Sequence, residues 1–158
     1  MAKLISSFLV ALAALLSSSA ALAADGVALT SAVFVERFIA DNDGKTRVVL
    51  QEPKVVTPGD KMIFVLNYHN VGRASANNFV VTNPMPSAVA YEATNDPAAE
   101  LSVDGGRTWG PLHALKTREG DGNWRAARAE DVTHVRWMMR TAIPAGAQGK
   151  LSFRGVVR

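Results

Sequence analysis

The chain contains no cysteine, and this absence excludes several kinds of protein at once. Without a thiol there is no cysteine nucleophile, and no lipid-modified cysteine can anchor the protein. Disulfide bonds are also excluded, so the fold must be stabilised by packing alone. A chain of this length buries enough apolar surface to do so.

Runs of basic residues are also missing. The net charge is only +3, and arginines such as Arg125, Arg128, Arg136 and Arg140 are scattered rather than clustered. Proteins that bind nucleic acid usually carry a basic stripe with interleaved aromatic side chains. We therefore expect no nucleic-acid partner.

The usual signatures of catalysis are lacking as well. No serine lies in a G-x-S-x-G turn. Glu119 and Asp121 are close carboxylates, but Gly120 and Gly122 indicate a flexible surface turn around them. General acid–base catalysis needs side chains held in a fixed geometry. We expect neither enzymatic activity nor a cofactor.

The three histidines show no metal-binding spacing. No H-x-H or H-x-x-x-H pattern occurs, and the methionines that copper favours form no cluster. The residues considered are His69, His113, His134, Met62, Met85, Met138 and Met139. We expect no metal site beyond an adventitious pair of ligands.

The N-terminal residues have the pattern of a secretory signal. Lys3 precedes an apolar run from Leu4 to Leu16, and Ala21-Leu22-Ala23 matches an A-x-A cleavage site. The run is too short for a membrane span, which needs about 20 apolar residues. We predict a cleaved signal over residues 1–23, with the cut after Ala23 and with Ala21 and Ala23 as the two small residues of the cleavage pattern. Residues 24–158 then form one soluble domain, exported to the periplasm or outside the cell.

Alternation of apolar and polar residues dominates the mature chain, and no stretch shows a helical stripe. Short alternating segments separated by turn residues are typical of antiparallel sandwiches. We predict an all-β, immunoglobulin-like antiparallel β-sandwich of about seven to nine strands. The predicted strands are 27–39, 46–50, 61–70, 79–82, 89–91, 134–140 and 151–157.

Two of these strands have a clear inner face. Met62, Phe64, Leu66 and Tyr68 share one face of the 61–70 strand, which is predicted to be central and to pair with 79–82. The 134–140 strand is predicted to point Val135, Trp137 and Met139 inward.

The first strand is partly apolar on both faces, which predicts a strand that is shared between layers or covered on both sides. Asp41–Gly44 follows it and is predicted to be a hairpin turn, because Asn, Asp and Gly tolerate positive φ. Its D-x-D-G spacing also occurs in calcium loops, but Lys45, Thr46 and Arg47 follow where further oxygen ligands are needed.

An ordered set of residues resembles the conserved repeat domain of prokaryotic secreted and cell-surface proteins, a domain of unknown function. The set is Pro58, Gly59, Asp60, Asn70, Gly72, Thr82, Asn83, Pro86 and Tyr91. The chain departs from the family pattern in having Asn83 where Asp is common, Met85 before the proline, and a single copy. The resemblance implies an Ig-like sandwich with a structural or adhesive role, and no catalytic residues to carry over.

Residues 102–109 match the S-x-D-x-G-x-T-W Asp-box. The fixed positions are Ser102, Asp104, Gly106, Thr108 and Trp109. The pattern predicts a hairpin in which the Asp104 carboxylate accepts backbone N–H groups and Trp109 anchors the turn in the core. Asp-boxes recur in sialidase propellers, but one copy in a chain of this length cannot build several four-stranded blades.

These observations favour a non-enzymatic, exported structural or adhesive module of the bacterial cell envelope, with an envelope or surface protein as partner. One alternative is a periplasmic module that binds a glycan or a metal, for which Trp124 is the main available aromatic side chain. Another is a subunit that self-assembles through its N-terminal strand.

Overall fold

The structure is a computed structural model that describes residues 21–22 and 26–158. These residues form eleven strands, more than the seven to nine expected, and two 3₁₀ turns, without an α-helix. The all-β prediction is confirmed. Within the described ranges, no helical segment has the length and hydropathy that a membrane crossing requires. Of the predicted signal, only Ala21 and Leu22 are described, and Ala23 lies outside these residues.

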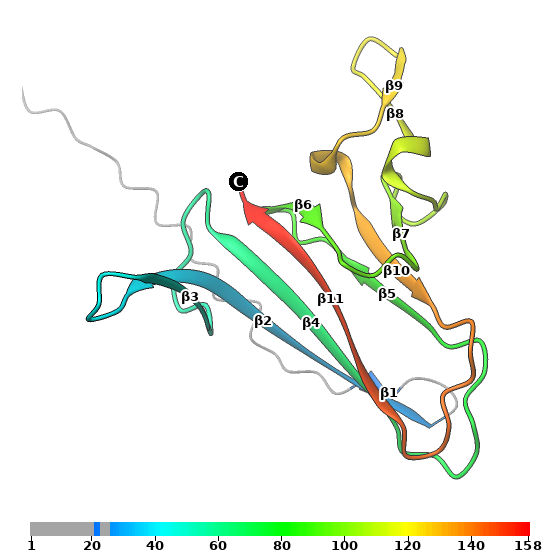
Figure 1. Cartoon of the computed structure of the whole chain (residues 1–158). Coiled ribbons are helices and arrows are strands. Elements are labelled where there is room, and N and C mark those ends of the chain that lie inside the picture. Colours follow the sequence, from blue (N-terminus) through cyan, green and yellow to red (C-terminus); the bar gives the residue numbers. More distant parts are fainter. Residues whose placement is uncertain (1–20, 23–25) are drawn as a thin grey trace, which may run out of the picture.

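All strand pairs are antiparallel (Figure 1). The larger sheet has the order β1-β2-β4-β11-β6, with β3 also paired to β2. The smaller sheet has the order β5-β10-β7, and β8 and β9 form a separate hairpin. The strands are β1 (Ala21–Leu22), β2 (Val27–Ala40), β3 (Thr46–Gln51), β4 (Lys61–Asn70), β5 (Val80–Pro84), β6 (Val89–Ala93), β7 (Ala99–Ser102), β8 (Lys116–Arg118), β9 (Trp124–Ala126), β10 (His134–Met138) and β11 (Gln148–Val157). The 3₁₀ turns are Leu112–Ala114 and Ala129–Asp131.

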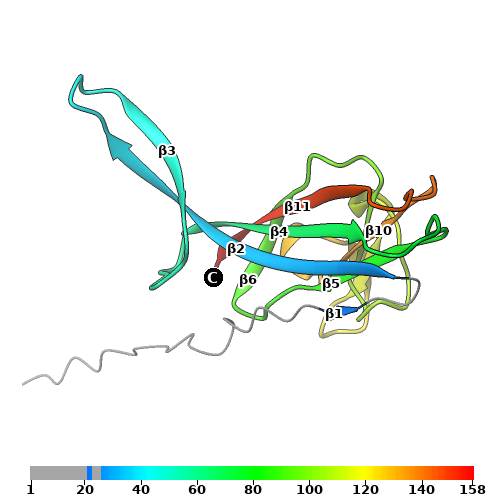
Figure 2. The ribbon, with the colours of Figure 1, turned by 90° about the horizontal axis from the view of Figure 1, so that it is seen from below.

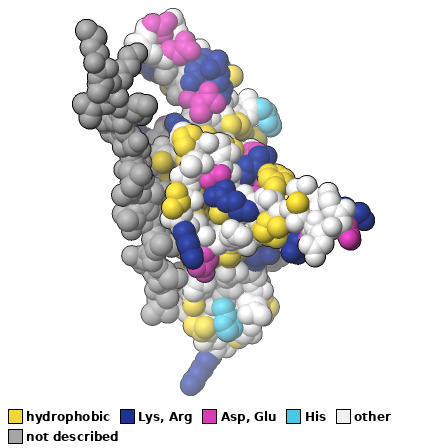
Figure 3. Space-filling model, turned by 90° about the vertical axis from the view of Figure 1, so that its left-hand side faces the viewer, with side chains coloured by type: hydrophobic (Ala, Val, Ile, Leu, Met, Phe, Trp, Pro, Cys, Tyr) yellow, Lys and Arg dark blue, Asp and Glu magenta, His cyan; other side chains and the backbone are white. Residues whose placement is uncertain are grey.

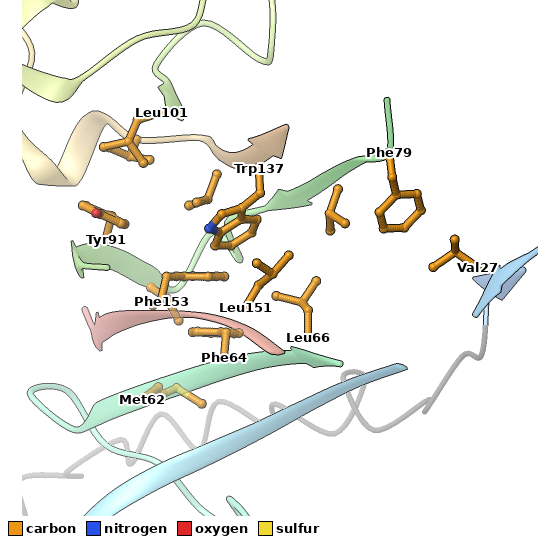
Figure 4. Packing of buried hydrophobic residues seen from close by; sticks show 14 of the residues in the cluster. Val27, Met62, Phe64, Leu66, Phe79, Tyr91, Leu101, Trp137, Leu151 and Phe153 are labelled. Atoms are coloured by element: carbon orange, nitrogen blue, oxygen red, sulfur yellow. The ribbon is translucent and has the colours of Figure 1, made fainter. Parts of the chain in front are cut away.

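The core lies between the two sheets (Figure 4). Trp137 of β10 is 1% exposed and packs against Phe153 of β11, with ring centroids 6.1 Å apart. Phe153 in turn stacks on Phe64 of β4 at 4.6 Å. The predicted inward faces of β4 and β10 are therefore correct at their buried positions, because alternation decides which side chains leave water.

The predicted pairing of the 79–82 segment with the central strand is wrong. β5 pairs with β10 in the smaller sheet, and the neighbours of β4 are β2 and β11. Residues 71–79 carry the chain from one sheet to the other. Alternation fixes the face of a strand but not its partner, so this crossing is not visible in the sequence pattern.

β2 is the longest strand and extends past the body of the molecule. Its first nine residues, Val27 to Val35, pair with β4, and residues 36–40 pair only with β3 (Figures 1 and 2). The prediction that both faces of the first strand are covered is wrong for this second half, where Phe38 is 69% exposed. We call the projecting hairpin, residues 36–51, the arm.

Candidate interaction surface

The arm ends in a tight turn. The Gly44 N–H donates to the Asp41 carbonyl at 2.9 Å, and the Asp41 N–H donates to the Lys45 carbonyl at 2.7 Å. Gly44 has a φ of 73°, a conformation that side chains with a Cβ rarely adopt. The predicted hairpin turn is confirmed.

One face of the arm is apolar and exposed to solvent. Phe38 lies directly opposite Val48, and Leu50 lies opposite Glu36, so these side chains point to the same side of the ribbon. Phe38, Val48 and Leu50 are 69%, 53% and 50% exposed. Figure 3 shows hydrophobic side chains gathered along the projection and charged side chains at its tip. We call these three residues the arm patch.

An ion pair fixes one side of the base of the arm. Arg37 donates two hydrogen bonds to Asp60, at 2.5 and 3.1 Å, and one to the Val55 carbonyl at 3.2 Å. Asp60 also accepts the Thr57 N–H at 2.8 Å. The Arg37 guanidinium, followed by the Thr57 N–H, lowers the pKa of Asp60 despite its partial burial. The aspartate of the Pro58-Gly59-Asp60 motif thus connects the arm to the start of β4.

A second ion pair lies on the opposite face of β2. Glu36 and Arg37 are consecutive, so their side chains leave the strand on opposite sides. The Glu36 side chain is 7% exposed and lies 2.9 Å from Arg154 of β11. The arm is therefore held on both faces where it leaves the sheet, and its exposed patch has a defined direction.

The other residues of the family-like motif are structural and do not converge on one site. Asn70 is fully buried, donates to the carbonyls of Ala74 and Ile143, and accepts the Gly72 N–H. It therefore organises the start of the crossing between the sheets. The remaining positions lie apart: Pro58 and Gly59 in the turn before β4, Thr82 and Asn83 on β5, Pro86 before β6, and Tyr91 in the core.

The Asp-box forms the predicted hairpin. Asp104 accepts the N–H groups of Arg107 and Thr108 at 3.0 Å and the Thr108 hydroxyl at 2.7 Å. The Ser102 hydroxyl donates to Asp104 and accepts the Gly106 N–H. The bonds from Thr108, followed by the one from Ser102, hold the pKa of Asp104 well below its usual range.

The prediction that Trp109 enters the core is wrong. Trp109 is half-buried on the outer face of the smaller sheet, where the Arg136 guanidinium stacks 4.1 Å from its ring centroid. Its Nε1–H donates to the Gly106 carbonyl at 2.9 Å. Trp137 occupies the inner face of β10, so the Asp-box covers the outer face of that strand, on which His134 and Arg136 lie.

A second exposed aromatic side chain lies on the β8–β9 hairpin. Trp124 is 62% exposed, and Arg118 on the paired strand lies 4.9 Å from its ring centroid. Arg125 holds the hairpin to the body through two hydrogen bonds to Asp131, at 2.6 and 2.7 Å. Glu119 and Asp121 lie in the exposed turn of this hairpin, as expected from the flanking glycines.

Within the described ranges, no three histidine or acidic side chains converge in a geometry suited to a metal ion. His69 lies near the end of β4, His113 in an exposed turn, and His134 beside Trp109.

Comparison of the chain with known protein families, with curated proteins and with solved structures finds no match. The resemblance to the repeat domain therefore stays a prediction. Sequence reasoning missed the arm as a surface, although the signals were present: both strands are apolar on the side that no later strand covers. The Arg37–Asp60 pair, separated by 23 residues, had no local sequence signal.

Proposed function

We propose that the protein is an exported, non-enzymatic structural or adhesive module of the bacterial cell envelope that contacts a protein partner through the arm. The arm patch carries this proposal. Soluble proteins rarely expose contiguous apolar side chains, and those that do commonly use them in an interface. Phe38, Val48 and Leu50 are each at least half exposed and lie side by side.

The geometry at the base of the arm supports the same reading. A rigid contact surface loses less conformational entropy on binding than a mobile one. Arg37–Asp60 on one face and Glu36–Arg154 on the other hold the ribbon before any partner arrives. The patch also includes Phe38, and aromatic residues such as phenylalanine are enriched at the cores of interfaces.

The proposed architecture is an Ig-like sandwich. Its support is the pair of antiparallel sheets with the core between them, together with the motif resemblance at residues 55–91. The support for export is the signal pattern over residues 1–23.

The first test combines export with retention on envelopes. The full chain is produced in its source cells, and the exported protein is examined by intact mass. The 24–158 chain is then incubated with washed envelopes from those cells, with the wild type compared with Phe38→Ser. We expect a start at Ala24 and about tenfold weaker retention of the variant, because a central aromatic anchor is lost.

Val80→Ser is the matched control, because Val80 is 48% exposed on β5, away from the arm. Its retention should equal that of the wild type. If Phe38→Ser is retained as well as the wild type, the arm is not the contact surface. If the chain stays unprocessed inside the cell, the protein is not exported.

A second candidate function is glycan binding at Trp124, favoured by its 62% exposure on a projecting hairpin. An exposed indole ring offers a large flat contact surface with a polar edge. A glycan panel followed by tryptophan fluorescence tests this candidate. A change in fluorescence that a glycan causes in the wild type but not in Trp124→Ala would favour glycan binding as the function. An unchanged emission spectrum across the panel argues against this candidate.

A further inference from the structure

Two strands lie on the outer edge of β2. Leu29 pairs with both Ala21 of β1 and Tyr68 of β4, and Val35 pairs with both Gln51 of β3 and Met62 of β4. A strand has only two edges, so β1 and β3 lie on the edge opposite β4. Figure 2 shows β1 and β4 flanking β2 in this way.

Between them lies a stretch of edge that is only partly covered. β1 pairs with Ala28 and Leu29 alone, and β3 begins to pair at Val35. Among the described residues, positions 30–34 of β2 have no strand on this side. β1 lies within the predicted signal, so removal of residues 1–23 opens the edge over Val27–Phe34.

This stretch lacks the usual protection of a sheet edge. Exposed edges normally carry charges, prolines or bulges that prevent pairing with another chain. Val27–Phe34 reads VALTSAVF, without a charge or a proline. The pairing of β1 shows that this edge accepts an antiparallel strand.

Three of the other outer strands of the described fold, β5, β6 and β7, are protected. β6 is five residues long, carries Glu92, and faces a register irregularity at Arg154/Gly155. β5 ends in Pro84. β7 is followed by the Asp-box hairpin, which returns to form a bridge between Leu101 and Gly110. The contrast with these three strands favours the β2 edge as a pairing surface.

We infer that, in the mature protein, a second copy of this chain pairs with the 27–33 edge of β2, antiparallel and about a twofold axis at Thr30. Val27 then lies opposite Val33 of the second copy, Ala28 opposite Ala32, and Leu29 opposite Ser31. The two larger sheets become one continuous sheet across the axis.

The boundaries of the edge favour a second copy over an unrelated strand. At one end, β3 occupies the position next to Val35, so an incoming strand must end before it. At the other end, the chain turns at Gly26, which has a φ of 76° and accepts the N–H groups of Val71 and Gly72. In the twofold arrangement, each β2 ends at its own Gly26 turn before it reaches the β3 of the other copy. The two arms then project at opposite ends of the pair.

The side chains are also compatible with this register. Opposed residues of an antiparallel pair point to the same side, so inward Val27 and Val33 meet, and outward Ala28 and Ala32 meet. Thr30 is exposed and lies opposite itself on the outer face, where paired threonines are favourable. No like charges meet anywhere along the seven positions.

The test uses the absence of cysteine in the chain. Every core residue in the described part of the chain lies between Val27 and Val157, so the 24–158 chain keeps this core and is expected to fold without the signal. Residues directly opposite in an antiparallel pair have Cα atoms about 4.5–5.5 Å apart, within the range of a disulfide. Thr30→Cys in this chain is therefore expected to form a covalent dimer under mild oxidation. Thr82→Cys is the matched control, because Thr82 is an exposed threonine on β5. This variant should form about tenfold less covalent dimer than Thr30→Cys.

Light scattering of cysteine-free chains completes the test. The wild type should shift to twice the monomer mass as its concentration rises. Thr30→Lys places two positive charges opposite each other in the dimer. The concentration at which half of the chains are dimeric should therefore rise about tenfold or more. Equal crosslinking at residues 30 and 82, no crosslinking at residue 30, or a monomer at every concentration would overturn the inference.

The inference rests on the proposed export only for the removal of β1. The intact mass of the exported protein reports that step separately. A retained signal overturns the export, whereas crosslinking of the 24–158 chain still decides the pairing.

Discussion

Single carboxylates organise the turns of this molecule. Asp60, Asp104 and Asp131 each accept at least one backbone N–H, and Asp60 and Asp131 also bind an arginine. Each of these pKa values lies below its ordinary value because hydrogen-bond donors surround the charged form. Because the folded pKa of each lies below its unfolded value, each charged carboxylate stabilises the fold at neutral pH.

Asp104 provides a pH test at this scale. Its folded pKa is below the unfolded value of about 3.9, so its contribution is complete above that pH and is lost as the pH falls towards the folded pKa. Asp104→Asn should melt about 2–5 °C below the wild type at pH 7, and the gap should narrow between about pH 4 and pH 2. Thermal unfolding followed by circular dichroism measures both.

Asp43→Asn is the control, because Asp43 is an exposed carboxylate at the tip of the arm. Its melting temperature should match that of the wild type at pH 7. A gap for Asp104→Asn that stays constant down to pH 2 would show that the carboxylate charge does not stabilise the hairpin.

At the scale of elements, the arm is a two-stranded ribbon, and the pairing of its two strands is not enough to keep it folded. Isolated hairpins are marginal in water, because too little surface is buried. The arm persists because β2 continues into the sheet and because Arg37 connects it to Asp60. Its order thus depends on contacts at its base rather than at its tip.

Arg37→Met tests this dependence. The methionine keeps the aliphatic length but removes the hydrogen bonds to Asp60 and to the Val55 carbonyl. Hydrogen exchange of the β3 amides should accelerate about tenfold, while β11 amides in the core stay unchanged. Amide exchange followed by NMR or mass spectrometry measures both regions.

The matched control is Arg47→Met, which removes the exposed ion pair to Asp41 at the tip. Exposed ion pairs contribute little, so exchange in β3 should change less than in Arg37→Met. Faster exchange from the tip variant than from the base variant would contradict the proposed anchoring.

At the scale of the whole molecule, the sequence predicted the class and the inward faces, because alternation is a local signal. Phe64 and Trp137 lie on predicted inner faces, and both meet Phe153 in the core. Turn positions were likewise predictable, since Gly44 and the Asp-box rely on local backbone preferences.

What the sequence did not reveal is non-local. The assignment of β5 to the smaller sheet, the exposure of Phe38 and the outward position of Trp109 all depend on which strand covers which face. A pattern of period two reports that a residue is apolar, not that a neighbour exists to bury it. The arm patch is an apolar face of this kind.

The positions of the three tryptophans have a practical consequence. Trp137 lies in the core, Trp109 is half-covered beside Arg136, and Trp124 is exposed on a hairpin. The indoles therefore sample three different solvent environments in one chain. Each tryptophan therefore reports a different event through its emission. Trp137 reports global melting, Trp109 reports the opening of the Asp-box in acid, and Trp124 reports the docking of a ligand. The protein thus carries built-in optical reporters and needs no attached dye.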